Sequence, residues 1–406
     1  MLLSRHLSVE SFGRYTFYLA VFALLDSLTD FGTGAVAVQR TAGDPGAVAG
    51  VLRAGRRIRL ALAGGGLALV GLGVLATGEP GGGWILLAVG YELTHALELS
   101  ATVFKNRIAW GVPVAVRAFA SGARLALVLL LWSADVQSAA LFLFGTALGS
   151  SVANVLLHLC ARRHLPRGEQ PAPPAAGILR QALPLGLAGL CQQAYFYVDN
   201  VFVRSAGGEV PLGHYNAGVR LMSFLIMAAQ YATLAGLPWL ARRHARGDLG
   251  AAAARLAQPL FAGASLAAGL AWPWAGEILV AIFGGEGGFE AGGPSLRWLL
   301  LATALIYAGA PLLTAVVSTG STGAVLRVTA TALGVNLLGN AVLVPVAGIE
   351  GAAAATLATE LVVAAGAAAA LARLGVSPLA VRPLLWLAGP AAFLAGAWIS
   401  SGLGPG

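Results

Sequence analysis

Charged side chains are scarce in this sequence. They make up 10% of the 406 residues, whereas hydrophobic side chains make up 58%. A soluble domain carries about 25% charged residues, so this chain has too little polar surface to cover a water-soluble fold. Several apolar runs approach the length of about 20 residues that crosses a bilayer as a helix. The composition excludes an ordinary soluble domain and predicts a multi-pass protein of the cell membrane, surrounded by membrane lipids.

Cysteine and lysine are nearly absent as well. Cys160 and Cys191 lie in apolar runs and lack the spacing of a disulfide framework or a thiolate metal site. Lys105 is the only lysine, so arginine supplies nearly all of the 25 positive charges behind the net charge of +8. In a soluble protein this excess could indicate nucleic-acid binding, but arginines that fix membrane topology explain it better. We therefore expect no nucleic-acid partner.

Motifs for enzyme chemistry are also missing. The sequence contains no phosphate-binding P-loop, no Gly-x-Ser-x-Gly elbow and no His-Glu-x-x-His pair. We expect no ATPase activity, no enzyme activity and no cofactor. Coupling to H⁺ or Na⁺ is then the possible energy source for transport. A membrane-embedded glycosyltransferase or polymerase would need a sizeable outer loop with catalytic groups. The longest outer loop, residues 284–293, is rich in glycine and carries only Glu286 and Glu290 as acids, which argues against that class.

Twelve segments are expected to span the membrane. All should be helices, because a segment in lipid must satisfy its own backbone hydrogen bonds. The longest contains Trp272-Pro273-Trp274, where the proline is expected to kink or end the helix. The expected spans are residues 15–38, 57–77, 84–104, 112–132, 136–160, 178–204, 212–240, 252–283, 294–318, 322–346, 349–373 and 379–400.

Basic residues gather in every second connection between these spans. The positive-inside rule places the base-rich loops in the cytoplasm. The same rule places Met1 on the outer side, for which the simplest explanation is a missing helix before Met1. The base-rich connections hold Arg40, Arg53, Arg56 and Arg57, with Arg59 at the next helix start; Lys105 and Arg107; Arg162, Arg163, Arg167 and Arg180; Arg242, Arg243, Arg246 and Arg255; Arg327; and Arg373 and Arg382.

A short motif occurs twice in the sequence. Phe12-Gly13-Arg14-Tyr15 is echoed by Leu212-Gly213-His214-Tyr215, and an apolar helix follows each copy. The echo indicates a chain built twice from one multi-helix unit, as many transporters are. We predict an N-terminal helical bundle at residues 1–160, a cytoplasmic Pro/Arg-rich linker at 161–177, a C-terminal bundle at 178–373 and an additional C-terminal helix at 374–406.

Further motifs in a fixed order give the chain a family resemblance. They are the Phe12 segment above, Asp30-Phe31-Gly32-Thr33-Gly34, Tyr197-Val198-Asp199-Asn200, Gly213-His214-Tyr215-Asn216-Ala217 and Asn336-Leu337-Leu338-Gly339-Asn340. The chain resembles the polysaccharide or O-antigen flippases of the multidrug/oligosaccharidyl-lipid/polysaccharide exporter superfamily, which are related to lipid II flippases and to multidrug and toxin extrusion (MATE) transporters. In that family another helix precedes the Phe-Gly-x-Tyr segment.

The resemblance implies a fold, a substrate and partners. The implied fold is two pseudo-repeated helical bundles around a central cavity with alternating access. The implied substrate is a polyprenyl-pyrophosphate-linked oligosaccharide, such as an O-antigen or exopolysaccharide repeat unit, moved to the outer leaflet. A polysaccharide polymerase and glycosyltransferases are the candidate partners.

Three arginines fall inside predicted spans and suggest where a pyrophosphate binds. Arg117 and Arg124 are seven residues apart, on one helix face, and Arg220 lies in the second half. A guanidinium group offers a fork of donors to phosphate oxygens. We hypothesise that these three arginines line the cavity and bind the pyrophosphate. The alternative is that they extend to the membrane interface, above all Arg117.

Acidic side chains inside the predicted spans are candidates for ion coupling. Such groups are costly in a membrane and often titrate or bind cations. The alternative is charge pairing with the arginines. His95 lies between two acids on one helix face and could hold zinc, but a proton or Na⁺ site is favoured there, and we expect no metal. The candidates are Asp26, Asp30, Glu92, Glu98, Asp199 and Glu360.

Two other functions compete with the flippase. A MATE-type multidrug/cation antiporter would have the same architecture, but export of cationic drugs favours acids without an excess of arginine. The chain could also be an inactive, shortened homologue that serves as a scaffold. Arg117, Arg124 and Arg220 favour the anionic lipid head group of the flippase substrate.

Overall fold

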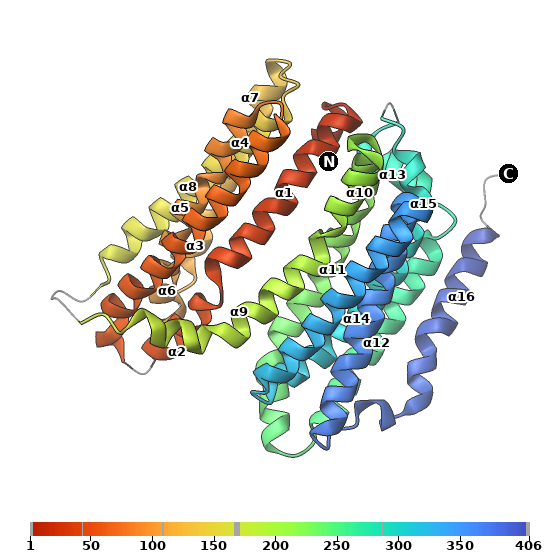
Figure 1. The fold of residues 1–406 in the computed structure, drawn as a ribbon. Helices are drawn as coiled ribbons and strands as arrows, with labels where there is room; N and C mark the ends of the chain where they lie inside the picture. The colour runs from red at the N-terminus through yellow and green to blue at the C-terminus, as the bar shows by residue number, and fades with distance from the viewer. Residues whose placement is uncertain (1–2, 43, 108, 166–170, 286, 403–406) are drawn as a thin grey trace. The chain divides into compact units, whose positions relative to one another are not determined.

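The computed structural model describes residues 3–42, 44–107, 109–165, 171–285 and 287–402. Throughout these residues the regular elements are helices, as Figure 1 shows. Within these described ranges, eight helices are long and apolar enough to cross a membrane, or nine if a bent pair counts as one span. The all-α, polytopic membrane fold is therefore confirmed. Met1, Glu286 and residues 166–170 of the predicted linker lie outside the described residues.

The chain forms two compact units, and each is described by itself. One unit is Phe17–Gln193. In it, α8 packs against α4, α5 and α7, and α3 packs against α5. This unit takes in most of α1 (Val9–Asp30), α2 (Thr33–Ala42), α3 (Val48–Thr77), α4 (Gly82–Val89), α5 (Tyr91–Glu98), α6 (Thr102–Asn106), α7 (Gly111–Ser133), α8 (Ala139–Arg162) and most of α9 (Ala175–Tyr197).

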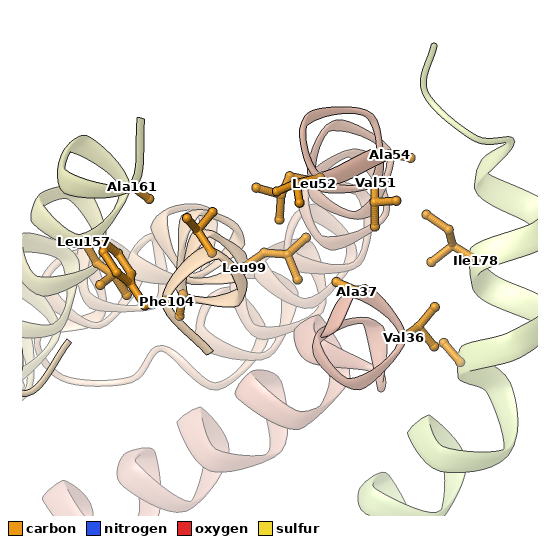
Figure 2. Close-up of a cluster of buried hydrophobic side chains, with 14 residues drawn as sticks. Val36, Ala37, Val51, Leu52, Ala54, Leu99, Phe104, Leu157, Ala161 and Ile178 are labelled. Atoms are coloured by element: carbon orange, nitrogen blue, oxygen red, sulfur yellow. The ribbon is translucent and has the colours of Figure 1, made fainter. Parts of the chain in front are cut away.

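A cluster of buried apolar side chains holds one end of this unit together. Figure 2 shows Val36 of α2 and Ile178 of α9 at one side of it, Phe104 and Leu157 at the other, and Leu52 of α3 and Leu99 between them. Each of these six side chains is nearly inaccessible to solvent. In lipid, where tails are as apolar as leucine, such close packing replaces the hydrophobic effect as the force between helices. The cluster fixes α2, α3, α8 and α9 at the end of the unit where the basic connections lie.

The other unit combines Met1–Thr16 with Ala194–Gly406. Its centre is α14, which packs against α11, α12 and α15, while α16 packs against α12. Small residues allow these close approaches, as where Gly309 of α14 meets Ala364 of α15. Besides the start of α1, the unit contains α10 (Asp199–Gly207), α11 (Glu209–Ala245), α12 (Leu249–Ala271), α13 (Ala275–Phe283), α14 (Gly293–Ser318), α15 (Thr322–Arg373) and α16 (Ala388–Ser401).

Two breaks predicted from the sequence are confirmed in this unit. The chain bends by 86° between α12 and α13, at the Trp272-Pro273-Trp274 segment. The 52-residue α15 is interrupted at Gly348, with φ 54° and ψ −130°. Beyond Gly348 the chain folds back, since Asn336 donates a hydrogen bond of 3.1 Å to the Thr359 hydroxyl. The predicted spans 322–346 and 349–373 are the two arms of this helical hairpin.

Three predicted spans are each divided into shorter helices. Span 15–38 breaks between α1 and α2, because the Asp30 carboxylate accepts the Gly32 amide at 3.1 Å and Gly32 adopts φ 72°. Span 178–204 is divided at Val198 into α9 and α10. Span 84–104 consists of α4, α5, the 3₁₀ turn Leu99–Ala101 and α6, so the prediction of one continuous helix there was wrong.

Candidate functional site

The acids predicted on the first and third spans come together in the Phe17–Gln193 unit. Asp26 and Asp30 lie on the last turns of α1, and Glu92 and Glu98 lie on α5 with His95 between them. Glu92 is fully buried and accepts a 2.8 Å hydrogen bond from the Thr29 hydroxyl. The packing of α1 against α5 thus brings the groups of both helices into one polar network, which we call the α1–α5 cluster.

Arg59 of α3 is an unforeseen member of this network. Its side chain is 1% exposed and forms an ion pair with Asp30. It also donates to the Thr33 hydroxyl at 2.8 Å and lies 3.6 Å from Glu98. Counting Arg59, at a helix start, among the bases that set the topology therefore missed its pairing with Asp30. The sequence around Arg59, which follows other arginines, did not indicate that it pairs with acids, because those acids come from other helices.

His95 is the centre of the α1–α5 cluster. Its Nε2 lies 3.1 Å from Glu98 Oε2, and its Nδ1 lies 3.2 Å from Asp26 Oδ1 and 3.5 Å from Glu92 Oε2. The Tyr91 hydroxyl donates to the Asp26 carboxylate, and the Tyr91 ring stacks on the imidazole with centroids 6.1 Å apart. Three carboxylates therefore surround one imidazole, and each is held in place by a second contact.

The three predicted pyrophosphate ligands have different surroundings. Arg117 on α7 forms a 2.6 Å ion pair with Glu98, although its side chain is 61% exposed. Arg124, on the same helix, donates to the Ser121 hydroxyl at 3.1 Å. Arg220 on α11 is exposed and belongs to the other unit. Within the described residues, neither Arg124 nor Arg220 has an acidic side chain within ion-pair distance. Their joint role stays a prediction.

Asp199 is the centre of a second buried network, in the unit that contains α10 to α16. It is 2% exposed and accepts hydrogen bonds from the Tyr215 hydroxyl and from the backbone and side chain of Asn200. Asn216 donates to Asn200 at 2.7 Å. The Tyr215 oxygen lies 3.5 Å from the Thr356 hydroxyl on the second arm of α15. This network of oxygen and amide groups joins α10, α11 and α15.

Both arms of α15 contribute further polar groups to this unit. Asn336 and Asn340 are fully buried on the first arm, and Asn340 donates to Asn336 at 3.1 Å. Thr359 and Glu360 are buried on the second arm, one turn beyond Thr356. The two asparagines carried the family resemblance but were not among the predicted site residues. Amide side chains in an otherwise apolar helix were the signal that could have identified them.

The comparisons with known proteins agree with this architecture. The family model described as MatE matches residues 184–342. No curated protein matches the chain. Among solved structures, a lipid II flippase, MurJ, in an inward closed conformation superposes with a TM-score of 0.73 at 12% identity, covering 99% of this chain and 94% of MurJ.

Transporters of the MATE family superpose as well. A mutant of the MATE transporter VcmN from Vibrio cholerae gives a TM-score of 0.61 at 13% identity, covering 90% of this chain and 88% of VcmN. An inward-facing multidrug resistance MATE transporter of the MOP superfamily gives 0.64 at 14% identity, covering 98% of this chain and 92% of that transporter. The chain therefore has the fold shared by a lipid II flippase and by multidrug transporters of the MOP superfamily.

Proposed function

We propose that this protein is a transporter that moves a polyprenyl-pyrophosphate-linked oligosaccharide across the cytoplasmic membrane. The observation that carries the proposal is the pair of arginines, Arg124 and Arg220, in membrane-spanning helices without an acidic partner among the described residues. The likeness to a lipid II flippase supports the same reading at the level of the fold.

An arginine inside a membrane-spanning helix needs a compensating environment. Ionisable groups at that depth almost always face the bundle interior or a water-filled space, and they mark substrate or ion pathways. Arg220 is exposed on α11, and Arg124 is partly exposed on α7. Their guanidinium donors match the oxygens of a pyrophosphate, because two parallel N–H donors bind a phosphate group in a bidentate manner. On α7, Arg117 would contribute a further charge beside Arg124, shared with Glu98.

The buried acids supply candidate sites for the coupling ion. The Asp199 carboxylate is bonded to the Tyr215 hydroxyl, whose oxygen lies 3.5 Å from that of Thr356, and oxygen ligands of this kind suit a hard cation. Glu360, also buried, lies one helical turn from Thr356. We propose that H⁺ or Na⁺ entering this network drives transport. Asp30 and Glu98 are less suited to coupling, since each pairs with an arginine.

A MATE-type antiporter for cationic drugs is the second candidate function. The observation in its favour is the MatE family match over residues 184–342, the region that contains Asp199. Cationic substrates would be bound by carboxylates, whereas the lipid pyrophosphate would be bound by arginines. The two functions therefore depend on different residues. An inactive homologue would depend on neither.

The test is a translocation assay on the purified chain in proteoliposomes. The vesicles would carry a polyprenyl-pyrophosphate-linked oligosaccharide, and its accessibility to an external enzyme would report movement between leaflets. Arg124→Ala and Arg220→Ala should each slow translocation roughly tenfold or more, since a hydrogen bond to a charged group contributes about 1.5–3 kcal/mol. Arg246→Ala is the matched control, because Arg246 is an exposed base just beyond α11.

Three results would distinguish the candidates. Loss of lipid translocation in both variants with full activity in the control supports the flippase. Efflux of drug cations by a chain that moves no lipid would support the antiporter. Wild-type protein that moves neither substrate would identify an inactive homologue, and unchanged lipid translocation in Arg124→Ala and Arg220→Ala would remove the arginines from the mechanism.

A further inference from the structure

We propose that Asp26, Glu92 and His95 form a binding site for a divalent transition-metal ion, with Zn²⁺ as the best fit. One ligand atom of each residue lies within 4.8 Å of the other two. The sequence did not reveal this set, because Asp26 comes from α1 and the other two residues come from α5. The site lies wholly in the Phe17–Gln193 unit, and the proposal does not depend on which substrate the protein moves.

The distances between ligand atoms fit a tetrahedral ion. Zinc binds histidine nitrogen and carboxylate oxygen at about 2.0–2.2 Å, so neighbouring ligand atoms in a tetrahedron are roughly 3.3–3.5 Å apart. His95 Nδ1 lies 3.2 Å from Asp26 Oδ1 and 3.5 Å from Glu92 Oε2. Both separations match the edge of such a tetrahedron. The third separation, between the Asp26 and Glu92 oxygens, is at most 4.8 Å, so an ion would draw these two carboxylates together.

The orientation of the imidazole favours a metal over a simple hydrogen bond. His95 Nε2 faces Glu98 Oε2 at 3.1 Å, which suits donation by an Nε2–H group. Metal-ligating histidines commonly donate their other N–H to a carboxylate in this way, which fixes the tautomer. Nδ1 then presents its lone pair to Asp26 and Glu92. Nδ1 is buried, and no group in the described part of the chain forms a well-aligned hydrogen bond with it.

The site has more negative than positive charge, and a bound cation would compensate the difference. Arg59 pairs with Asp30, and Arg117 pairs with Glu98. Among the described residues, His95 is the basic neighbour left to the other two acids of the cluster. The Glu92 side chain is 1% exposed. Its Oε1 atom is buried, and no group of the described residues forms a hydrogen bond with it. A divalent ion with a neutral imidazole would balance both carboxylates.

The mixed ligand set selects the class of ion. An imidazole nitrogen suits Zn²⁺ and neighbouring transition metals, whereas Na⁺, Mg²⁺ and Ca²⁺ prefer all-oxygen sites. Three protein ligands leave a fourth position for water, as in zinc sites that are not purely structural. The Asp26 side chain is 40% exposed, which gives an ion a route to the site. A bound ion would link the end of α1 to α5.

The experiment measures metal binding by the purified full-length chain, carrying an affinity tag without histidines and stripped with a chelator. Titration with Co²⁺, a spectroscopic substitute for Zn²⁺, should give the visible absorption bands of a tetrahedral ion at one equivalent, and Zn²⁺ should displace it. His95→Ala and Glu92→Gln should abolish this equivalent. Glu98→Gln should weaken it by about 10- to 100-fold, as loss of a supporting hydrogen bond does.

His158→Ala is the matched control. His158 belongs to the same unit but contacts Arg56 and Ser100 rather than a cluster of carboxylates, so its removal should leave the equivalent intact. X-ray absorption at the zinc edge of the wild-type protein needs no variant and should show one imidazole among oxygen ligands. Wild-type protein without a stoichiometric Co²⁺ or Zn²⁺ equivalent, or a His95→Ala variant that keeps it, would overturn the proposal. A zinc spectrum with sulfur ligands would do the same.

Discussion

Gly13 of α1 lies in backbone contact with Gly213 of α11: a Cβ atom on Gly13 would be 3.0 Å from the Gly213 amide nitrogen and closer still to the Glu209 carbonyl oxygen. In return, a Cβ on Gly213 would meet the Val9 carbonyl oxygen at 2.5 Å. The two copies of the motif that repeats in the sequence therefore pack against each other. Nearby, Arg14 Nε lies 3.9 Å from Glu209 Oε1 across the same crossing.

Replacing Gly13 with a larger residue should force these two helices apart. Gly13→Val should lower the free energy of unfolding by about 1–3 kcal/mol, because added methyl groups in a packed site cause strain. Thermal denaturation of the purified protein in detergent would measure the loss. Gly65→Ala on α3 is the control, since a Cβ there meets nothing within 4 Å. Equal melting temperatures for both variants would show that the crossing is not close-packed.

Removing the Arg59 side chain should destabilise the Phe17–Gln193 unit. Arg59→Met leaves Asp30 without its ion-pair partner; because the Asp30 side chain is 39% exposed, the cost should be below the roughly 3–5 kcal/mol of a fully buried pair. Adding Asp30→Asn in the same chain should restore part of the loss. Arg57→Met, at an exposed position two residues earlier, should have little effect. Limited proteolysis and thermal melting would compare the three variants, and an Arg59→Met protein as stable as wild type would contradict the assignment.

Neutralising Asp199 should uncouple transport from the H⁺ or Na⁺ gradient. Asp199→Asn preserves the size of a side chain that is 2% exposed, yet removes the carboxylate bonded to Tyr215. We expect transport in proteoliposomes to lose its dependence on an imposed H⁺ or Na⁺ gradient. Asp135→Asn, in a connection between α7 and α8, should keep the wild-type dependence. A gradient response in Asp199→Asn equal to that of wild type would exclude Asp199 as the coupling group.

Gly348 should not tolerate a side chain. Its φ of 54° with ψ of −130° is accessible to glycine but strained for other residues. Gly348→Ala should therefore cost about 1–3 kcal/mol, the range for one residue in a sparsely populated region. Gly334→Ala, within the first arm of α15 and with no atom near its Cβ, is the matched control. The measurement is the melting temperature of each variant, and a Gly348→Ala protein that melts with the control would refute the strain.

Much of the helical fold could be predicted from the sequence, and the limits follow from particular residues. Apolar length located the spans, Trp272-Pro273-Trp274 marked one true break, and the boundary between spans 322–346 and 349–373 matched the other, at Gly348. The division at Gly32 was missed, because it depends on a hydrogen bond from its amide to the Asp30 carboxylate. A hydropathy pattern does not reveal a side chain that takes a backbone amide away from the hydrogen bonds of the helix.

The candidate site could be predicted only in part for a similar reason. Spacing along one helix placed Glu92, His95 and Glu98 on a common face, and the structure brings Asp26 to it from α1. Spacing could not pair residues on different helices. Arg59 was therefore taken for a topology-setting base, although it neutralises an acid of α1 inside the unit.

The hairpin of α15 also determines how this part of the chain is threaded through the bilayer. Arg327 of the first arm and Arg373 of the second line the same cavity of about 490 Å³, so both ends of the hairpin emerge together. A reporter enzyme fused after Gly320 should therefore occupy the same compartment as one fused after Gly375, and the positive-inside rule predicts that this compartment is the cytosol. A fusion at Gly348 should report the opposite side of the membrane. The three fusions would therefore serve as an internal reference when the topology of the other helices is mapped.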